Sequence, residues 1–338
     1  MHIFRRSIFC LFASCLVACG ETDTSPEVVP DVINEVLENE SVQEASVEAF
    51  PDTLMTSGLL SGLYKNAGET APVVLIIPGS GPTDLNGNNT IGGESNVYLQ
   101  LAEGLAEQGV STVRVDKRGL FSSGKAGNPN EVTVDIYAKD YSDWVNTIRT
   151  ETGVACVYVL GHSEGALMAS AAANINPNVC GQILVSGVGR SFGEVLREQL
   201  KAQPGGALLM KKPLANIDKL ERGERIADED LDMISRNIFP SHVQDFLISL
   251  MQTDPAEMAK TANTKTLIVH GETDIQTAVV DAEALASATG GTLVIVPGVN
   301  HILKEAPLNR LKNIRTYNQP DLPISEVVVD AIARFVTS

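Results

Sequence analysis

The feature that most constrains the fold is an alternation between short apolar runs and longer segments of helical period. The runs are rich in β-branched residues and apolar throughout, which is typical of strands buried on both faces of a sheet. They are Val73–Ile77, Thr112–Val115, Val157–Leu160, Gln182–Val185, Thr266–Val269 and Thr292–Val296. The helices expected between them are Val97–Gln108, Ile136–Thr150, Gly165–Ile175 and Val279–Ala288. This order predicts an α/β fold with a mostly parallel central sheet and helices on both faces.

The alternation is interrupted once, over residues 189–264. This segment is rich in charge, helical in composition, broken by Pro and Gly, and has no convincing strand. An insertion between two strands of a parallel sheet is typical of a helical cap over the strand carboxyl ends, where such folds bind ligands. We therefore expect a core of residues 51–188 and 265–338 and a cap insertion of residues 189–264. Residues 324–336 predict a last amphipathic helix whose apolar side holds Val327, Val328, Ile332, Phe335 and Val336.

The first 18 residues have the pattern of an export signal. Arg5 and Arg6 precede an apolar run, Ile8 to Ala18, that is too short to span a bilayer. The segment Leu16–Cys19 resembles the lipobox of bacterial lipoproteins. That resemblance implies a signal peptide over residues 1–18 and a lipidated Cys19, which would anchor the chain to a membrane of the bacterial cell envelope, on the periplasmic or other extracytoplasmic side. An ordinary cleaved signal peptide is the alternative.

The charge of the chain argues against nucleic acid as a partner. The formal net charge is −17, and a surface of this sign repels both phosphate backbones and anionic lipid headgroups. Membrane attachment would therefore depend on acyl chains. Residues 20–50 contain nine acidic residues and no Lys or Arg. Residues 19–50 are predicted to form an acidic flexible tether.

Two of the five cysteines lie in the expected core. Cys156 and Cys180 each precede one of two strands that are consecutive in the chain, and strands that lie side by side in a parallel sheet begin at the same edge. Parallel neighbours lie about 4.8 Å apart and a disulfide needs Cα atoms about 5.5–6 Å apart, so a disulfide is geometrically reasonable. Two buried thiols are the alternative. No CxxC motif or Cys/His cluster indicates a metal site.

The pattern G-x-S-x-G occurs twice. Val157–Leu160 runs into Gly161-His162-Ser163-Glu164-Gly165 and then into a helix of small residues, which is the strand–turn–helix context of a nucleophile elbow. The second match, centred on Ser191, also follows a strand. One more strand must come between the nucleophile and the acid-bearing strand, and only Ser163 leaves room for it. Ser163 is the predicted nucleophile, and Ser191 is expected where the chain enters the cap.

A serine nucleophile needs a base and an acid to orient that base. His301 follows the last strand in a loop, whereas the other histidines lie in the signal, the elbow, the cap or a strand. Asp274 lies in the turn after the strand Thr266–Val269, with Glu272 and Asp281 as competitors. The order Ser163, Asp274, His301 is the order of the hydrolase triad.

The oxyanion of the transition state needs two amide donors. The N–H of Glu164, the residue after the nucleophile, is one. The turn after Val73–Ile77 is rich in small residues that let the backbone approach a substrate. We choose Ser80 in that turn as the second donor, with Gly81 as the alternative.

At these residues the chain resembles the α/β-hydrolase superfamily from about residue 55 to its end. It is more closely similar to bacterial carboxylesterases, through the motifs Gly79–Asp84, Asp116–Gly119, Gly161–Gly165, Gly271–Asp274 and Asn300–Lys304. The resemblance implies a serine esterase that cleaves small-molecule carboxylic esters through an acyl-enzyme, with a helical cap and no cofactor. An acyltransferase or amidase with the same residues, and a ligand-binding lipoprotein without activity, are the alternatives.

Two charged segments are not expected to take part in the chemistry. Asp84 to Asn88 begins like a calcium loop, but Asn89 replaces the glycine at the sixth position and Ser95 replaces the glutamate at the twelfth. We expect no metal there. The charges of Asp116–Gly119 are expected to form structural ion pairs.

Overall fold

We describe the fold from a computed structural model of the chain, which describes residues 51–90, 92–202 and 210–338. The expected signal peptide, Cys19 and the acidic tether lie outside the described residues. Among the described residues, no helix combines the length and the apolar character that crossing a bilayer requires.

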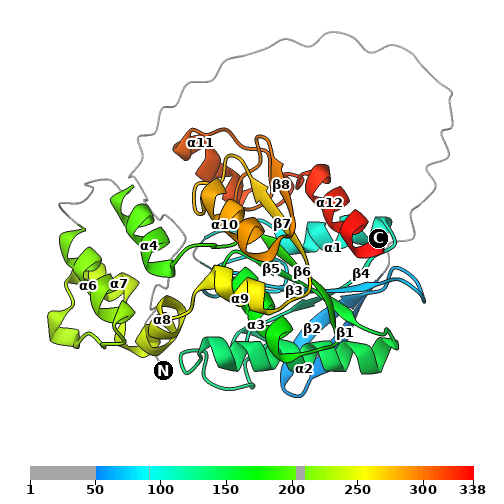
Figure 1. Cartoon of the computed structure of the whole chain (residues 1–338), viewed down its shortest axis with the longest axis horizontal. Coiled ribbons are helices and arrows are strands. Elements are labelled where there is room, and N and C mark those ends of the chain that lie inside the picture. The colour runs from blue at the N-terminus through cyan, green and yellow to red at the C-terminus, as the bar shows by residue number, and fades with distance from the viewer. Residues whose placement is uncertain (1–50, 91, 203–209) are drawn as a thin grey trace, which may run out of the picture.

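The core is an eight-stranded sheet with the order β1-β2-β4-β3-β5-β6-β7-β8 (Figure 1). The pairs β1–β2 and β2–β4 are antiparallel and all the others are parallel. The strands are β1 (Asp52–Ser57), β2 (Leu60–Lys65), β3 (Val73–Ile77), β4 (Ser111–Val115), β5 (Val157–His162), β6 (Val179–Val185), β7 (Lys265–Gly271) and β8 (Thr292–Val296). The predicted mostly parallel sheet is confirmed.

Helices cover both faces of the sheet, as predicted. They are α1 (Val97–Glu107), α2 (Val134–Thr152), α3 (Glu164–Ile175), α10 (Val279–Thr289) and α12 (Glu326–Thr337), while the short α11 (Arg310–Arg315) belongs to neither apolar cluster. Buried residues of α2, α3 and α10 form one apolar cluster, and those of α1 and α12 form another. In β3, Leu75 faces the first cluster and Ile76 the second. Alternating side chains of an all-apolar strand thus fill both layers.

The prediction for Val327 in the last helix is wrong. Its side chain is 54% exposed, whereas Val328 and Val329 are 1% and 5% exposed. A helix turns about 100° per residue, so adjacent positions cannot all share one face. The packing of α12 against α1 selects Val328 and Val329 for the buried side.

Between β6 and β7 the structure has a helical insertion at the left of Figure 1. Its helices are α4 (Phe192–Lys201), α6 (Lys211–Glu221), α7 (Met233–Ile238), α8 (Gln244–Met251) and α9 (Pro255–Thr261). The first four contact one another around buried Ile217, Leu220 and Phe239. Helix α9 packs instead against α3 and α10 of the core. The last helix of the insertion therefore belongs to the core by its contacts.

Cys156 and Cys180 form a disulfide in the structure, with Cα atoms 5.2 Å apart. Val157 pairs with Val179, but the next pair is Tyr158 with Gly181, so Cys180 is the extra residue of a β-bulge. The disulfide lies where β5 and β6 begin. The loops at the other ends of these strands hold the residues described next.

Candidate active site

Ser163 lies in a tight turn between β5 and α3, where the backbone is strained. Its φ of 57° and ψ of −123° lie in a region that residues with a side chain rarely adopt. A Cβ atom at Gly161 would lie 2.0 Å from the carbonyl oxygen of Gly165. One at Gly165 would lie 2.5 Å from the carbonyl oxygen of Ile77. Only glycine fits at positions 161 and 165, two residues before and two residues after Ser163. The turn therefore has the geometry of a nucleophile elbow.

His301 and Asp274 are joined by a hydrogen bond. His301, in the loop after β8, donates from Nδ1 to Oδ2 of Asp274 across 2.7 Å. The same carboxylate accepts from the N–H of Gln276 (2.7 Å) and the hydroxyl of Thr277 (2.9 Å). Burial raises the pKa of Asp274, but the charge and the hydrogen bond of His301 outweigh burial and lower this pKa to about 2. Asp274 is therefore ionised at neutral pH, and Nε2 is the basic nitrogen of His301.

The competing residues from the sequence lie elsewhere. Glu272 accepts a hydrogen bond from the N–H of Gly298 at 3.2 Å. Asp281 lies in the first turn of α10 and accepts from the guanidinium of Arg190 at 3.0 Å, at the entrance to the insertion. Ser191 is the N-cap of α4, with its hydroxyl accepting from a backbone N–H at 3.2 Å. Each of the three therefore has a structural role away from the His–Asp pair.

The turn after β3 lies directly against the elbow. A Cβ atom at Gly79 would lie 3.1 Å from Cβ of Ser163. The hydroxyl of Ser80 donates to Oε2 of Glu164 at 3.0 Å, and Nζ of Lys117 donates to the carbonyl oxygen of Gly79 at 2.6 Å. Burial raises the pKa of Glu164, and the charge of Lys117 and the hydrogen bond from Ser80 oppose this. The two residues expected to hold the oxyanion are thus bonded to each other beside Ser163.

His162 connects this turn to the loop of His301. The hydroxyl of Tyr98 accepts from the N–H of Gly79 at 3.0 Å and lies 2.9 Å from Nδ1 of His162. Nε2 of His162 lies 2.7 Å from the carbonyl oxygen of His301. All three contacts are satisfied when Tyr98 donates to Nδ1 and a neutral His162 donates from Nε2. Burial lowers the pKa of His162 to about 3, which keeps it neutral.

Ser163 and His301 line the same pocket, which has a volume of about 90 Å³. Its polar wall includes Asn89, Gln276 and Tyr317, and Nε2 of Gln276 donates to the hydroxyl of Tyr317 at 3.0 Å. Among the described residues that line it, none is Asp, Glu, Lys or Arg. The sequence patterns identified neither Gln276 nor Tyr317. Gln276 could have been suspected as a pocket residue because it is close to Asp274 in the sequence. No feature of the sequence marks Tyr317.

Lys304, the last residue of the Asn300–Lys304 motif, joins two walls of the pocket. Its buried ammonium group donates to the carbonyl oxygens of Ser95 (2.7 Å) and Gln319 (2.6 Å). Burial lowers the pKa of Lys304 to about 8. The lysine therefore holds the loop before α1 against the segment that carries Tyr317.

The described residues contain no group of three or more His, Cys, Asp and Glu side chains placed to hold a metal ion. In the segment that begins like a calcium loop, Oδ1 of Asp84 accepts from the N–H groups of Asn86 (2.9 Å) and Asn88 (2.8 Å). The carboxylate of Asp84 thus stabilises the loop in which it lies, and this loop forms part of the pocket wall.

Residues 89–305 match the protein family described as "Serine aminopeptidase, S33". Among curated proteins, Esterase EstD of Thermotoga maritima is 26% identical over 277 residues, covering 78% of this chain and 62% of that protein. The chain thus spans less than two thirds of the length of this relative.

Solved structures are similar over most of the chain. Est1E from Butyrivibrio proteoclasticus with bound ferulic acid has a TM-score of 0.54 and 16% identity, over 84% of this chain and 98% of that one. A lipase-esterase related protein from Clostridium acetobutylicum has a TM-score of 0.51 and 14% identity, over 82% and 99% of the two chains. The predicted α/β-hydrolase fold is confirmed by these similarities.

Proposed function

Because the chain belongs to the serine aminopeptidase S33 family, we propose that it is a serine hydrolase that cleaves carboxylic esters of small molecules. The observation that carries the proposal is the 2.7 Å hydrogen bond between His301 and Asp274 beside a pocket that also contains Ser163. The name of the relative Esterase EstD agrees with ester substrates.

In the proposed reaction the hydroxyl of Ser163 attacks the ester carbonyl carbon. Nε2 of His301 takes the hydroxyl proton, and ionised Asp274 stabilises the imidazolium that forms. The N–H groups of Ser80 and Glu164 hold the oxyanion. The proton then passes from His301 to the leaving alcohol, and an acyl group remains on Ser163. Water, activated by the same histidine, attacks the acyl-enzyme, releases the acid and restores the serine.

The pocket favours esters over aminoacyl peptides. An aminopeptidase binds a substrate that carries an ammonium group, and such a group needs a carboxylate near the reacting bond. None of the described residues that line the pocket is Asp or Glu, so no carboxylate is present there to hold such a group. The volume of about 90 Å³ is small beside the roughly 300–1,000 Å³ of pockets for drug-sized ligands. We therefore propose short, uncharged acyl groups.

A substrate panel tests the proposal. p-Nitrophenyl acetate and butyrate should be hydrolysed with a higher kcat/KM than the octanoate and dodecanoate, and aminoacyl p-nitroanilides should not be cleaved. Cleavage of the anilides without the esters would make the protein an aminopeptidase. Acyl transfer to added alcohols faster than acid release would make it an acyltransferase. No turnover and no labelling by a fluorophosphonate would leave a ligand-binding protein.

We also propose that Cys19 carries a lipid anchor at the cell envelope. The lipobox-like segment Leu16–Cys19 supports this, and the acidic residues after it would form a tether between membrane and enzyme. Cys19→Ala should move the protein from the membrane fraction to the soluble envelope fraction. Retention of this variant in the membrane pellet would overturn the anchor.

A further inference from the structure

Lys117 is a buried cation beside the candidate oxyanion hole, and the reaction as described above does not use it. Lys117 lies just after β4 and is only 5% exposed. Its ammonium group donates to the carbonyl oxygen of Gly79 at 2.6 Å. Burial lowers the pKa of Lys117, and the negative charge of Glu164 opposes this shift. The sequence motif around Lys117 suggested only structural ion pairs. The observed acceptor is instead a backbone carbonyl.

That carbonyl belongs to the same peptide group as the N–H of Ser80. The chain has no cis peptide bond among the residues described, and in a trans peptide the C=O and the N–H point in opposite directions. A donor that fixes the oxygen of Gly79 therefore also fixes the direction of the N–H of Ser80. Lys117 does not line the pocket, whereas Gly79, Ser80 and Ser163 do. The N–H is thus directed away from Lys117, and the residue that carries it, Ser80, lines the pocket.

The ammonium charge adds an electrostatic effect to this orientation. A cation at the oxygen of an amide draws electron density from the nitrogen and makes the N–H a stronger donor. The effect is large only where water does not screen it, and both Lys117 and Gly79 are buried. The hydroxyl of Ser80 is held at the same time by Glu164. The peptide group and the side chain of Ser80 are therefore both held in place before a substrate binds.

We propose that Lys117 is a positioning residue of the oxyanion hole, which aims and polarises the N–H of Ser80 through the Gly79–Ser80 peptide group. This inference rests on the proposed ester hydrolysis. It predicts an effect in the transition state, where the carbonyl oxygen becomes charged, and little effect on binding of the neutral substrate.

Three variants separate orientation from charge. Lys117→Met removes both, Lys117→Gln retains a neutral donor, and Lys117→Arg retains the charge. With p-nitrophenyl acetate, kcat of the Met variant should fall roughly 10- to 100-fold, less than or equal to the loss of one oxyanion donor, while KM stays within about twofold. The Gln variant should lose less than the Met variant, and the Arg variant the least.

Arg118→Met is the matched control. The guanidinium of this next residue pairs with Asp140 and donates to the carbonyl oxygen of Ala126 at 2.5 Å, away from the pocket. Its loss should lower the melting temperature and leave kcat within about twofold. An equal fall of kcat in the Arg118 and Lys117 variants, or a Lys117→Met variant with unchanged kcat, would overturn the proposal. If the Met variant does not fold, the Gln and Arg variants test the proposal: a higher kcat for Arg supports it, and a higher kcat for Gln would overturn it.

A trifluoromethyl ketone gives a second readout that a merely structural role would not move. It forms a hemiketal oxyanion on Ser163, so its inhibition constant should rise by the same factor as kcat/KM falls across the Lys117 variants. Failure of the wild-type protein to hydrolyse any ester would overturn the proposed function alone. Lys117 is then tested by the rate of Ser163 phosphonylation by a fluorophosphonate, which also places negative charge on an oxygen in this hole. An unchanged phosphonylation rate in Lys117→Met would overturn the positioning role.

Discussion

The core and the helical insertion each contain one G-x-S-x-G segment, and the two segments have different roles. In the core, Ser163 has a φ of 57°, and its flanking glycines are required by backbone atoms of the turn itself (at Gly161) and of the end of β3 (at Gly165). At the insertion, Ser191 has an ordinary φ of −59° and caps α4. A Cβ atom at Gly189 would lie 2.0 Å from the carbonyl oxygen of Asp281, so this glycine serves the contact between α10 and the chain entering the insertion. Both serines therefore precede a helix, but Ser163 does so in a strained turn and Ser191 with ordinary backbone angles.

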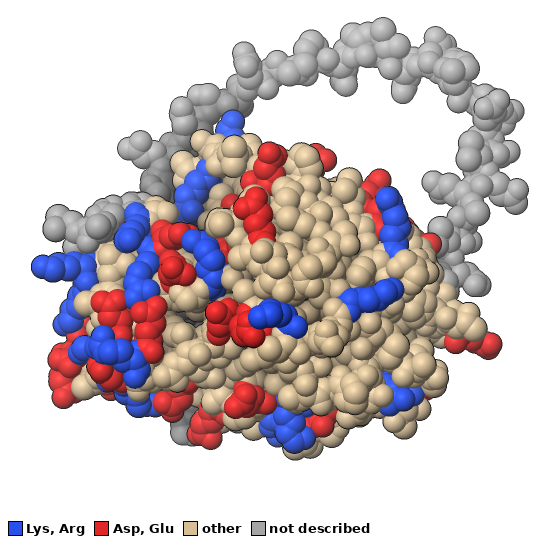
Figure 2. Space-filling view, in the orientation of Figure 1, with Lys and Arg blue, Asp and Glu red and all other residues tan. Residues whose placement is uncertain are grey.

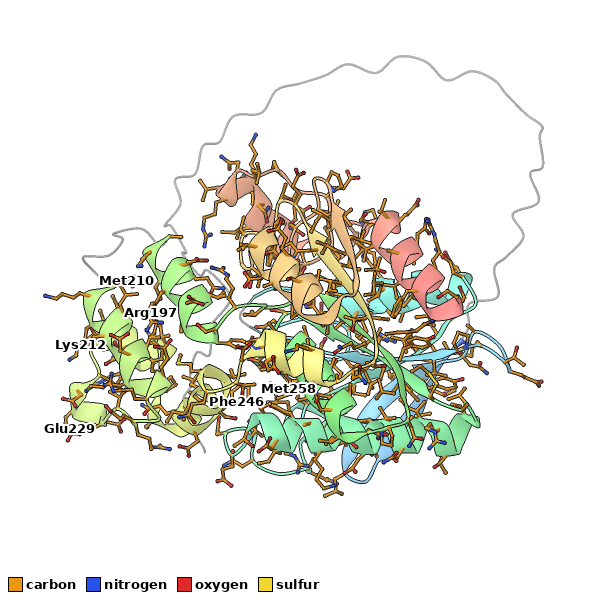
Figure 3. All side chains as sticks on the ribbon, in the orientation of Figure 1. Arg197, Met210, Lys212, Glu229, Phe246 and Met258 are labelled. Carbon is orange, nitrogen blue, oxygen red and sulfur yellow. A yellow bond between two sulfur atoms is a disulfide. The ribbon has the colours of Figure 1, made fainter. Side chains whose placement is uncertain are left out.

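The core and the insertion also differ in what their polar side chains bond to. In the core, buried Lys117, Lys304 and His162 bond to backbone groups around the candidate site. In the insertion, charged side chains pair with one another at the surface, as Figure 2 shows for its crowded red and blue left side. Arg197, between α4 and α6 in Figure 3, pairs with Asp218 and Glu221. We infer that core polar groups set geometry, whereas insertion charges contribute little to stability.

The two serines give the largest expected difference. Ser163→Ala should reduce ester turnover roughly 10⁴- to 10⁶-fold, because the nucleophile is lost. Ser191→Ala removes only a helix cap and should cost about 1 kcal/mol of unfolding free energy with unchanged kcat. Steady-state kinetics and urea unfolding of both variants measure this. A dead Ser191→Ala variant beside an active Ser163→Ala variant would reverse the assignment of the elbow.

Reduction of the disulfide should lower core stability without changing the site. The bond joins residues 24 apart, and the chain-entropy model gives about 3.5 kcal/mol for a loop of this length. Reduction, or a Cys156→Ser and Cys180→Ser double variant, should therefore lower the melting temperature by roughly 5–10 °C. Turnover by the still-folded enzyme should be unchanged, because the bond lies at the strand ends opposite Ser163. A fall of kcat in step with reduction would contradict this.

The buried His162 should make stability depend on pH. Burial holds the pKa of His162 at about 3, against 6.5 for an exposed histidine. Between these values the unfolded chain binds a proton that the folded chain does not, so the free energy of unfolding falls as the pH falls below 6.5. The loss is about 2 kcal/mol between pH 6.5 and 5. Asp274, whose pKa is lowered to about 2, loses its stabilisation only below about pH 4.

His162→Gln should flatten this dependence in urea unfolding at pH 7, 6 and 5. Burial also lowers the pKa of His270, so part of the slope should remain. The matched control is His242→Gln in the insertion, where the side chain is exposed and the slope should not change. An equal slope in the wild type and the His162→Gln variant would show that folding does not lower the pKa of His162.

The smallest effect is expected for the surface charges of the insertion. Arg197→Met should cost roughly 0.5–1 kcal/mol, because its partners Asp218 and Glu221 return to water when it is removed. High salt should reduce the difference between the variant and the wild type. Arg114→Met in the core, where a fully buried guanidinium pairs with Asp52, should cost several times more. Equal losses in urea unfolding would contradict the contrast between the two regions.

The sequence by itself determined the features that local chemistry controls. The all-apolar runs can be buried only as strands with helices on both faces, so the sheet was predictable. The glycines around Ser163 leave one type of turn, and the chain order of Ser163, Asp274 and His301 followed from the order of the strands. Of the two candidate acids Asp274 and Asp281, Asp274 is the one that hydrogen-bonds to His301.

The tertiary structure alone decided which polar side chains meet around the site. The sheet order places β3 between β4 and β5, so Lys117 at the end of β4 reaches Gly79 at the end of β3. Tyr98 and Tyr317 come from segments far from the elbow in sequence, with no motif to mark them. A charge in a sequence motif has no preferred partner until the strands are arranged, because hydrogen bonds depend on positions in space and distance along the chain does not specify these. That is why Lys117 suggested an ion pair in the sequence and bonds to a backbone carbonyl in the fold.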